Sequence, residues 1–194
     1  MSELLDSIER VAPADEHEAR AKARIVAHVA GGGALFRRDR WDGHLTGSAF
    51  VLDAEGRRLL LLFHRKLERW LQPGGHGEPD EVDPLAVATR EAMEETGVVG
   101  LELHPTAPRP FDLDVHAIPA RKDEPSHEHL DVRYLFVAPR GAELRAQEAE
   151  ASALAWVPLE EASRVGDHSV ARAVRKIVAL VGSATDQQLA ARAR

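Results

Sequence analysis

The sequence predicts an α/β fold, and three observations support this class. Short apolar segments typical of strands recur between residues 44 and 158, a strongly periodic helix interrupts them over 83–96, and helical periodicity occupies both ends of the chain. A length of 194 residues suits one domain with terminal extensions. We therefore expect an N-terminal helical arm and connection over 1–43, a central domain over 44–165, and a C-terminal helix over 166–194 that packs on this domain.

Helical periodicity in the N-terminal arm is clearest after Asp15. Small apolar residues recur at i, i+3, i+4 between Glu16 and Ala30, and the glycines at 31–33 end this helix. A strand is then expected over 44–52, followed by a turn and an apolar strand over 58–63. Two strands joined by a short turn that contains glycine predict a hairpin.

The long helix has a recognisable start and end. Asp83 precedes Pro84, which is typical of an N-cap followed by the first helical residue, and Gly97 after Thr96 is typical of a C-cap. A short strand over 69–72 comes before this helix. Later elements are expected as strands over 98–103, 111–118, 130–138 and 155–158, and as an amphipathic helix over 170–181 with an extension over 185–194.

Composition excludes several classes of protein. The chain contains no cysteine, so it has no disulfide scaffold, no thiolate zinc site and no cysteine nucleophile. No apolar run approaches the ~18 residues that a membrane-spanning helix needs. The first residues lack the basic and apolar regions of a secretory signal, so we expect a cytoplasmic protein that does not bind membranes.

The charge balance argues against nucleic acid as a partner. Acidic residues number 32 and Lys plus Arg 25, for a net charge of −7, and the arginines are spread over every segment. A dispersed, net acidic surface repels a phosphate backbone. An acidic balance does suit a protein that gathers carboxylates around a hard cation.

Three glutamates on the long helix carry the clearest chemical signal. Glu91, Glu94 and Glu95 stand at i, i+3 and i+4, so their carboxylates share one helix face and repel each other. A divalent cation removes this repulsion, and ligands that are all oxygen select Mg²⁺ or Mn²⁺ over zinc. The preceding pair of glycines allows the backbone to approach a bound ion or phosphate closely.

At these residues the sequence resembles the Nudix hydrolase family. Its signature is G-x5-E-x7-R-E-U-x-E-E-x-G-U, in which U is bulky and apolar. Gly75 and Glu81 match the opening, and the segment from Arg90 to Val98 matches the close. Eight residues separate Glu81 from Arg90, one more than the pattern has, and the small Ala92 stands at a U position. We expect a longer entry loop to absorb the extra residue without moving the three glutamates.

The resemblance implies an α/β/α sandwich around a mixed sheet, here with helical arms at both termini. It also implies that water attacks a diphosphate linkage with the help of Mg²⁺ or Mn²⁺. Glu94 and Glu95 would be metal ligands, and Glu91 would be a ligand or the base that activates water. Gly75 would offer its carbonyl to a metal, and Arg90 would hold the carboxylates in place. Glu81 would support the loop.

A second group of polar residues follows the alternation of two predicted strands. Asp112, Asp114 and His116 share one face, and so do His127, His129, Asp131 and Arg133. These faces are interpreted either as the solvated side of a sheet or as a substrate pocket beside the metal site. In the pocket interpretation His76 lies at the lip, Arg133 contacts phosphate, and the histidines contact base, sugar or phosphate. Neighbouring histidines also suggest zinc, but no spacing typical of a closed three-ligand site is present.

The sequence thus favours a metal-dependent hydrolase acting on a small-molecule substrate, a nucleoside diphosphate linked to another group X. The alternative is a non-catalytic regulator of the same fold that binds nucleotides or nucleotide sugars. This alternative is disfavoured because every carboxylate of the Nudix signature is present. A protein–protein scaffold that uses the helical arms is a third hypothesis, and a homodimer is left open. A metal-dependent rate on a panel of nucleotides separates the first hypothesis from the others.

Overall fold

The computed structural model describes residues 2–78, 81–121, 124–146 and 151–192. Its helices are α1 (Ser2–Glu9), α2 (Glu16–Gly31), α3 (Pro84–Thr96), α4 (Leu159–Val165) and α5 (His168–Arg192). Its strands are β1 (His44–Leu52), β2 (Arg58–His64), β3 (Arg69–Leu71), β4 (Gly74–His76), β5 (Glu102–Leu103), β6 (Asp112–Ile118), β7 (His127–Val137) and β8 (Ala151–Pro158). No helix in these described ranges is both long and apolar enough to cross a membrane.

The strands form one mixed sheet with the central order β3-β2-β1-β7-β5. Strands β1 and β7 are parallel along their length, from His44 opposite His129 to Leu52 opposite Val137. The remaining pairings are antiparallel: β2 pairs with β1, β3 and β8, β7 pairs with β5 and β6, and β4 pairs with β1. The predicted mixed α/β architecture is therefore confirmed.

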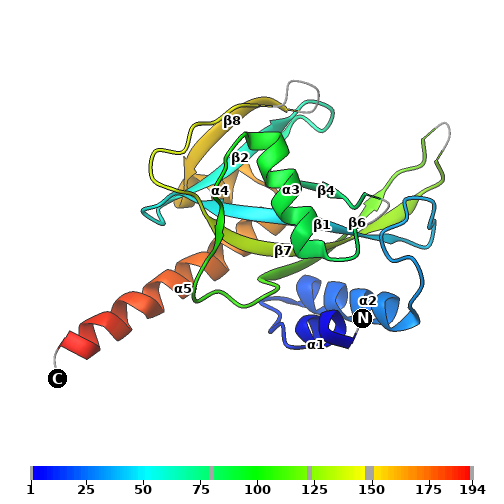
Figure 1. Cartoon of the computed structure of the whole chain (residues 1–194), viewed down its shortest axis with the longest axis horizontal. Helices are drawn as coiled ribbons and strands as arrows, with labels where there is room; N and C mark the ends of the chain where they lie inside the picture. The colour runs from blue at the N-terminus through cyan, green and yellow to red at the C-terminus, as the bar shows by residue number, and fades with distance from the viewer. Residues whose placement is uncertain (1, 79–80, 122–123, 147–150, 193–194) are drawn as a thin grey trace.

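Helices cover both faces of the sheet (Figure 1). One core cluster combines apolar residues of α1, α2 and α3 with alternate residues of β1 and β7. The other combines α4 and α5 with Phe50, Leu52 and Leu135, which come from the intervening positions of the same two strands. Because strand side chains alternate, each strand contributes to both cores.

Several predicted boundaries agree with the structure, and others need correction. The strand 44–52 and the helix after Asp83 are found, and Asp83 accepts a hydrogen bond from the Leu85 amide (2.9 Å). Gly97 adopts the left-handed conformation (φ 71°) of a C-cap. By contrast, the expected strand over 98–103 shrinks to β5, and β7 begins at His127 rather than at residue 130. The C-terminal extension continues α5 directly.

Helix α3 approaches the sheet closely because β1 contains glycine at the contact. A Cβ atom on Gly47 would lie 2.4 Å from the Pro84 carbonyl oxygen and 2.8 Å from the Ala88 amide nitrogen. Both atoms belong to the backbone of α3, so they cannot move aside as a flexible side chain would. The packing of the long helix against β1 and β4 therefore requires a residue without a side chain here.

We predict that Gly47→Ala lowers the free energy of unfolding by about 1–3 kcal/mol, because overpacking displaces α3 from the sheet. Urea unfolding followed by circular dichroism measures this change. Gly31→Ala is the matched control, since a Cβ there meets nothing within 4 Å. Equal stability of the two variants would show that the contact between α3 and β1 is not tight.

Candidate active site

The loop after β4 and the second half of α3 gather three carboxylates, those of Glu81, Glu91 and Glu94, around Arg90. Its Nη1 donates to Glu91 and to Glu94, each at 2.9 Å. Its Nε and Nη2 donate to the two carboxylate oxygens of Glu81 at 3.1 and 2.9 Å. A further bond from Nη2 to the His76 carbonyl oxygen (2.8 Å) ties the arginine to β4. One guanidinium thus fixes the helix face against the loop.

The extra residue between Glu81 and Arg90 does not displace Glu81. The carboxylate meets the guanidinium through two parallel hydrogen bonds, the strong geometry for this pair. Hydrogen bonding to Arg90 holds the pKa of Glu81 below its usual value, and the same bond raises the pKa of Arg90. The longer entry loop is accommodated before Asp83 caps the helix. Both residues remain charged at neutral pH and act as a rigid support.

Strand β4 contacts the carboxylates through backbone alone. A Cβ on Gly75 would lie 2.6 Å from the carboxylate carbon of Glu91, so a larger residue here would displace that carboxylate. The Gly74 amide donates to Glu95 Oε2 (2.9 Å). Glu95 is almost fully buried, whereas about half of the Glu94 side-chain surface is exposed. The glutamates of α3 therefore include a buried carboxylate, Glu95, held by the β4 backbone, and a solvent-exposed one, Glu94.

These residues fit a hard divalent cation. Glu91, Glu94 and Glu95 offer carboxylate oxygens on one helix face, and the glycine backbone passes directly beside Glu91. Oxygen ligands with room for water and for phosphate oxygens are what Mg²⁺ and Mn²⁺ prefer. In the structure Arg90 supplies the positive charge that keeps these carboxylates together.

A groove opens beside this cluster, between the loop after β4 and the connection that follows α2. Its volume is about 1040 Å³. Glu81, which holds Arg90, lines the groove, and so do Phe36, Arg37 and Arg38. Its walls combine apolar side chains with the exposed Arg37 and Arg38, and Arg37 is paired with Asp39 of the same wall. The groove can therefore hold a molecule that has both an apolar ring and phosphate.

Comparison with known proteins decides the family. A family model described as the NUDIX domain matches residues 43–180, more than half of the chain. The chain belongs to the Nudix hydrolase family. It is 35% identical over 121 residues to a probable DHNTP pyrophosphohydrolase of Lactococcus lactis subsp. cremoris. That match covers 61% of this chain and 65% of the relative, less than two thirds of the relative's length.

Solved structures with the same fold include two named hydrolases. A C. elegans Ap4A hydrolase in a binary complex superimposes with a TM-score of 0.57 at 20% identity, covering 72% of this chain and 98% of that one. The E. coli dihydroneopterin triphosphate pyrophosphohydrolase gives 0.53 at 14% identity, covering 69% and 94%. At these identities the likeness establishes the Nudix fold.

The second polar group of the Nudix domain is buried rather than solvated. Arg133 donates to Asp131 (2.6 Å), Asp114 (3.1 Å) and Asp112 (3.4 Å), and each of the four side chains is nearly inaccessible. Arg172 of α5 covers them and binds Asp112 (2.8 and 2.9 Å) and Asp114 (3.0 Å). We name these five residues the buried ion network. The interpretation as the wet side of a sheet is wrong for Asp112, Asp114, Asp131 and Arg133, whereas His116 is exposed.

This network changes what we expect of two predicted substrate ligands. Arg133 and Asp114 already neutralise each other inside the protein, so we no longer expect Arg133 to bind substrate phosphate. Sequence reasoning missed Arg172 because it lies on a helix whose apolar periodicity alone was used. An arginine within the apolar stripe, next to Ala173 and Val174 in the core, was the available signal.

The predicted histidines do meet, and His44 joins them. His76 and His129 lie with their Nε2 atoms 3.1 Å apart, and the His116 ring is 5.3 Å from that of His129. His44 and His127 complete the group, with ring centroids 4.9 and 5.4 Å from that of His129. We call these five residues the histidine cluster. Sequence spacing did not reveal it because His44 comes from β1 and reaches β7 only through parallel pairing.

Burial keeps much of the histidine cluster uncharged. It lowers the pKa of His44 and that of His76 to about 4 each, and the pKa of His129 to about 2. The positive charge of Arg38 adds to this effect at His76. The three rings are therefore neutral at pH 7 and offer lone pairs.

The buried ion network predicts a loss of stability in acid. Burial by itself raises the pKa of Asp114, but Arg133 and hydrogen bonds from His116 and Arg172 outweigh it and hold the pKa far below its usual value. A depressed pKa stabilises the fold above the unfolded value of 3.8 and loses this contribution as pH falls below it. We expect the free energy of unfolding to drop between about pH 5 and pH 2.

Asp114→Asn tests the assignment, since it leaves two buried arginines with one fewer negative charge. It should cost about 3 kcal/mol at pH 7 and flatten the acid dependence, both measured by urea unfolding across pH. Asp39→Asn, which removes an exposed partner of Arg37, is the control and should change little. An acid dependence unaltered in Asp114→Asn would contradict the assignment.

Proposed function

We propose that this protein is a metal-dependent hydrolase that cleaves the diphosphate linkage of a nucleoside diphosphate joined to another group X. The observation that carries the proposal is the complete carboxylate set of α3, held against β4 by Arg90. A structural surface would not keep several like charges beside a glycine backbone and at partial burial.

The residues divide into positioning and reacting groups. Glu81 and Arg90 fix the orientation of the loop and the helix, and the Gly74 amide holds Glu95. Glu91, Glu94 and Glu95, with the Gly75 carbonyl, would hold Mg²⁺ or Mn²⁺. The ion, when bound, neutralises developing charge on phosphate oxygens and lowers the pKa of the attacking water. Glu91 is placed to serve as a ligand or as the base for that water.

The groove supplies a place for the rest of the substrate. Arg38 is exposed at its wall and lies near enough to His76, the neighbour of Gly75, to lower the pKa of that histidine. We propose that Arg38 binds a phosphate outside the metal site and that the apolar wall of the groove receives the rest of the substrate. The names of the similar proteins, dihydroneopterin triphosphate pyrophosphohydrolase and Ap4A hydrolase, both denote substrates with linked phosphates. They support the substrate class and leave the individual compound open.

A non-catalytic nucleotide-binding regulator is the alternative. It requires the same groove but no metal ligands, so a missing carboxylate would have favoured it. Every carboxylate of the signature is present: Arg90 binds Glu81, Glu91 and Glu94, and the Gly74 amide binds Glu95. Turnover therefore decides between the two functions, whereas nucleotide binding alone does not.

We predict that the protein releases phosphate, after coupling to a phosphatase, from at least one compound in a panel of nucleoside di- and triphosphates, sugar nucleotides and dinucleoside polyphosphates. Turnover should need Mg²⁺ or Mn²⁺ and stop in EDTA. Glu94→Gln and Glu95→Gln should each lower kcat by about 100-fold or more, because a lost ligand removes charge stabilisation in the transition state. Their circular dichroism should match that of the wild type, since glutamine keeps the size of the side chain.

Glu102→Gln is the matched control, because Glu102 is an exposed carboxylate on β5 and belongs to no part of the site. It should keep full activity. A kcat close to that of the wild type in both Glu94→Gln and Glu95→Gln would contradict the assignment of these residues as metal ligands. Tight nucleotide binding without turnover of any compound in the panel would instead favour the regulator.

A further inference from the structure

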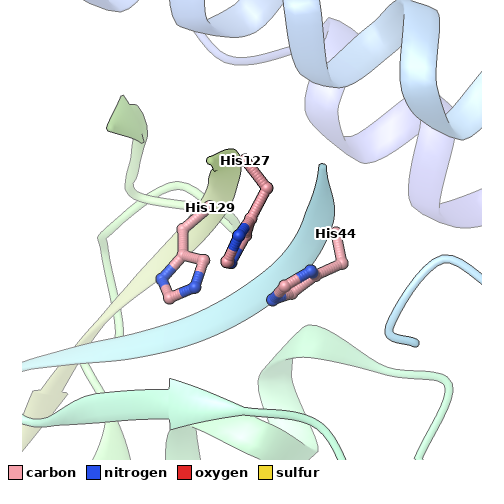
Figure 2. A group of neighbouring side chains, drawn as sticks. All are labelled: His44, His127 and His129. Carbon is pink, nitrogen blue, oxygen red and sulfur yellow. The ribbon is translucent and has the colours of Figure 1, made fainter. Parts of the chain in front are cut away.

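We propose that the imidazoles of His44, His127 and His129 form a binding site for a transition-metal cation of the Zn²⁺ type, separate from the carboxylate site of α3. The three rings come from the starts of β1 and β7 and face one another (Figure 2). One ring nitrogen of each lies within 4.8 Å of those of the other two. No three-ligand spacing for such a site is present along the sequence, because the parallel pairing of β1 with β7 brings the three histidines together.

The distances are close to what a tetrahedral ion needs. Zinc–nitrogen bonds of about 2.0–2.1 Å place two ligand nitrogens of a tetrahedral site roughly 3.3 Å apart. The observed spacing of up to 4.8 Å exceeds this by an amount that small rotations of the side chains can close. His76 approaches the group as well, with its Nε2 3.1 Å from that of His129, and is a candidate for the fourth position.

His44 gives independent evidence for a missing ligand. Its side chain is buried, with 1% exposed, and within the described part of the chain neither ring nitrogen makes a hydrogen bond of good geometry, although the Arg40 backbone lies close enough to act on the ring. A buried polar group without a partner costs about 1–3 kcal/mol, so native proteins rarely keep one without a reason. A cation bound to one of these nitrogens would use the unpaired group.

A backbone carbonyl orients His127 in the way that metal-ligating histidines are oriented. Its Nδ1 lies 2.9 Å from the Pro125 carbonyl oxygen, which can only accept, so Nδ1 carries the proton. In the neutral ring Nε2 then holds the lone pair. A hydrogen bond from the far nitrogen to a backbone carbonyl is the arrangement that fixes the tautomer of ligating histidines.

The donor atoms select a different metal from that of the carboxylates. Imidazole nitrogen suits Zn²⁺, Co²⁺, Ni²⁺ and Cu²⁺, whereas carboxylate and carbonyl oxygen suit Mg²⁺ and Mn²⁺. The two sites also use opposite faces of the same strands. Gly47 faces α3, whereas the registers that pair Thr46 with His76 and with Asp131 place the histidines on the other side. Zinc binding is therefore separable from hydrolysis.

The test uses the untagged full chain, stripped with a chelator and returned to excess Mg²⁺ so that the carboxylates are occupied. Titration with Zn²⁺, followed by metal analysis, should show one equivalent that Mg²⁺ does not displace. Co²⁺ in the same site should give the intense visible absorption of a tetrahedral ion, which an octahedral oxygen site does not produce. Neither readout depends on catalysis.

His44→Asn and His129→Asn should each weaken this binding by about 100-fold or more, because loss of an outer-shell partner alone already costs about 10–100-fold. His104→Asn, outside the histidine cluster, and Glu94→Gln should bind as the wild type does. If circular dichroism shows that His44→Asn does not fold, the zinc affinity of His129→Asn tests the proposal, because His129 is less buried. The proposal is overturned if the wild type takes up no zinc in Mg²⁺, if bound Co²⁺ is octahedral, or if a folded histidine variant binds like the wild type.

Discussion

The close contact between α3 and the backbone of β1 at Gly47 is the constraint on which the rest of the structure depends. It fixes the helix that carries the three glutamates at one height above the sheet. Strand β4 pairs with β1 so that Gly75 lies opposite Gly47. The position of Gly75 beside Glu91 therefore depends on the same contact. The carboxylate site is thus a property of strand pairing as much as of the helix itself.

The same strands give the opposite face a different character. Because side chains alternate, the residues next to these glycines point away from α3 and meet the polar residues of β7. Asp131 accepts hydrogen bonds from Thr46 (3.0 Å) and Ser48 (2.9 Å) of β1 and from Arg133. Beyond them lies the histidine cluster. One sheet therefore separates an oxygen-rich site from an imidazole-rich one.

The buried ion network connects the terminal helices to this sheet. Asp112 of β6 binds Arg172, and Lys176 of α5 reaches both Asp112 (3.3 Å) and Glu18 of α2 (2.5 Å). Glu18 also accepts from the Leu113 amide (3.2 Å) and is fully buried. Removing one member leaves a buried charge without its partner, whereas in the intact network the opposite charges compensate each other. Both helical arms therefore belong to the charge balance of the domain.

Local signals in the sequence were sufficient for the long helix and its chemistry. The Asp83–Pro84 start, the Gly97 end and the spacing of the glutamates are set within a few residues, and the structure reproduces them. The burial of Asp112 and Arg133 was not readable, because polar alternation looks the same whether water or α5 covers the strand. His44 was missed for a related reason: its partners depend on which strand lies beside β1. Pairing and coverage are tertiary properties.

The central claim is that the three glutamates of α3 hold the catalytic cation. Anomalous diffraction at the manganese edge, from crystals soaked in Mn²⁺, measures this position directly. The structure predicts manganese at ligand distance, about 2.0–2.3 Å, from carboxylate oxygens of Glu91, Glu94 or Glu95, beside Gly75. The anomalous peak should be absent from crystals of Glu94→Gln with Glu95→Gln. Manganese found only elsewhere, or a peak unchanged in the double variant, would contradict the account.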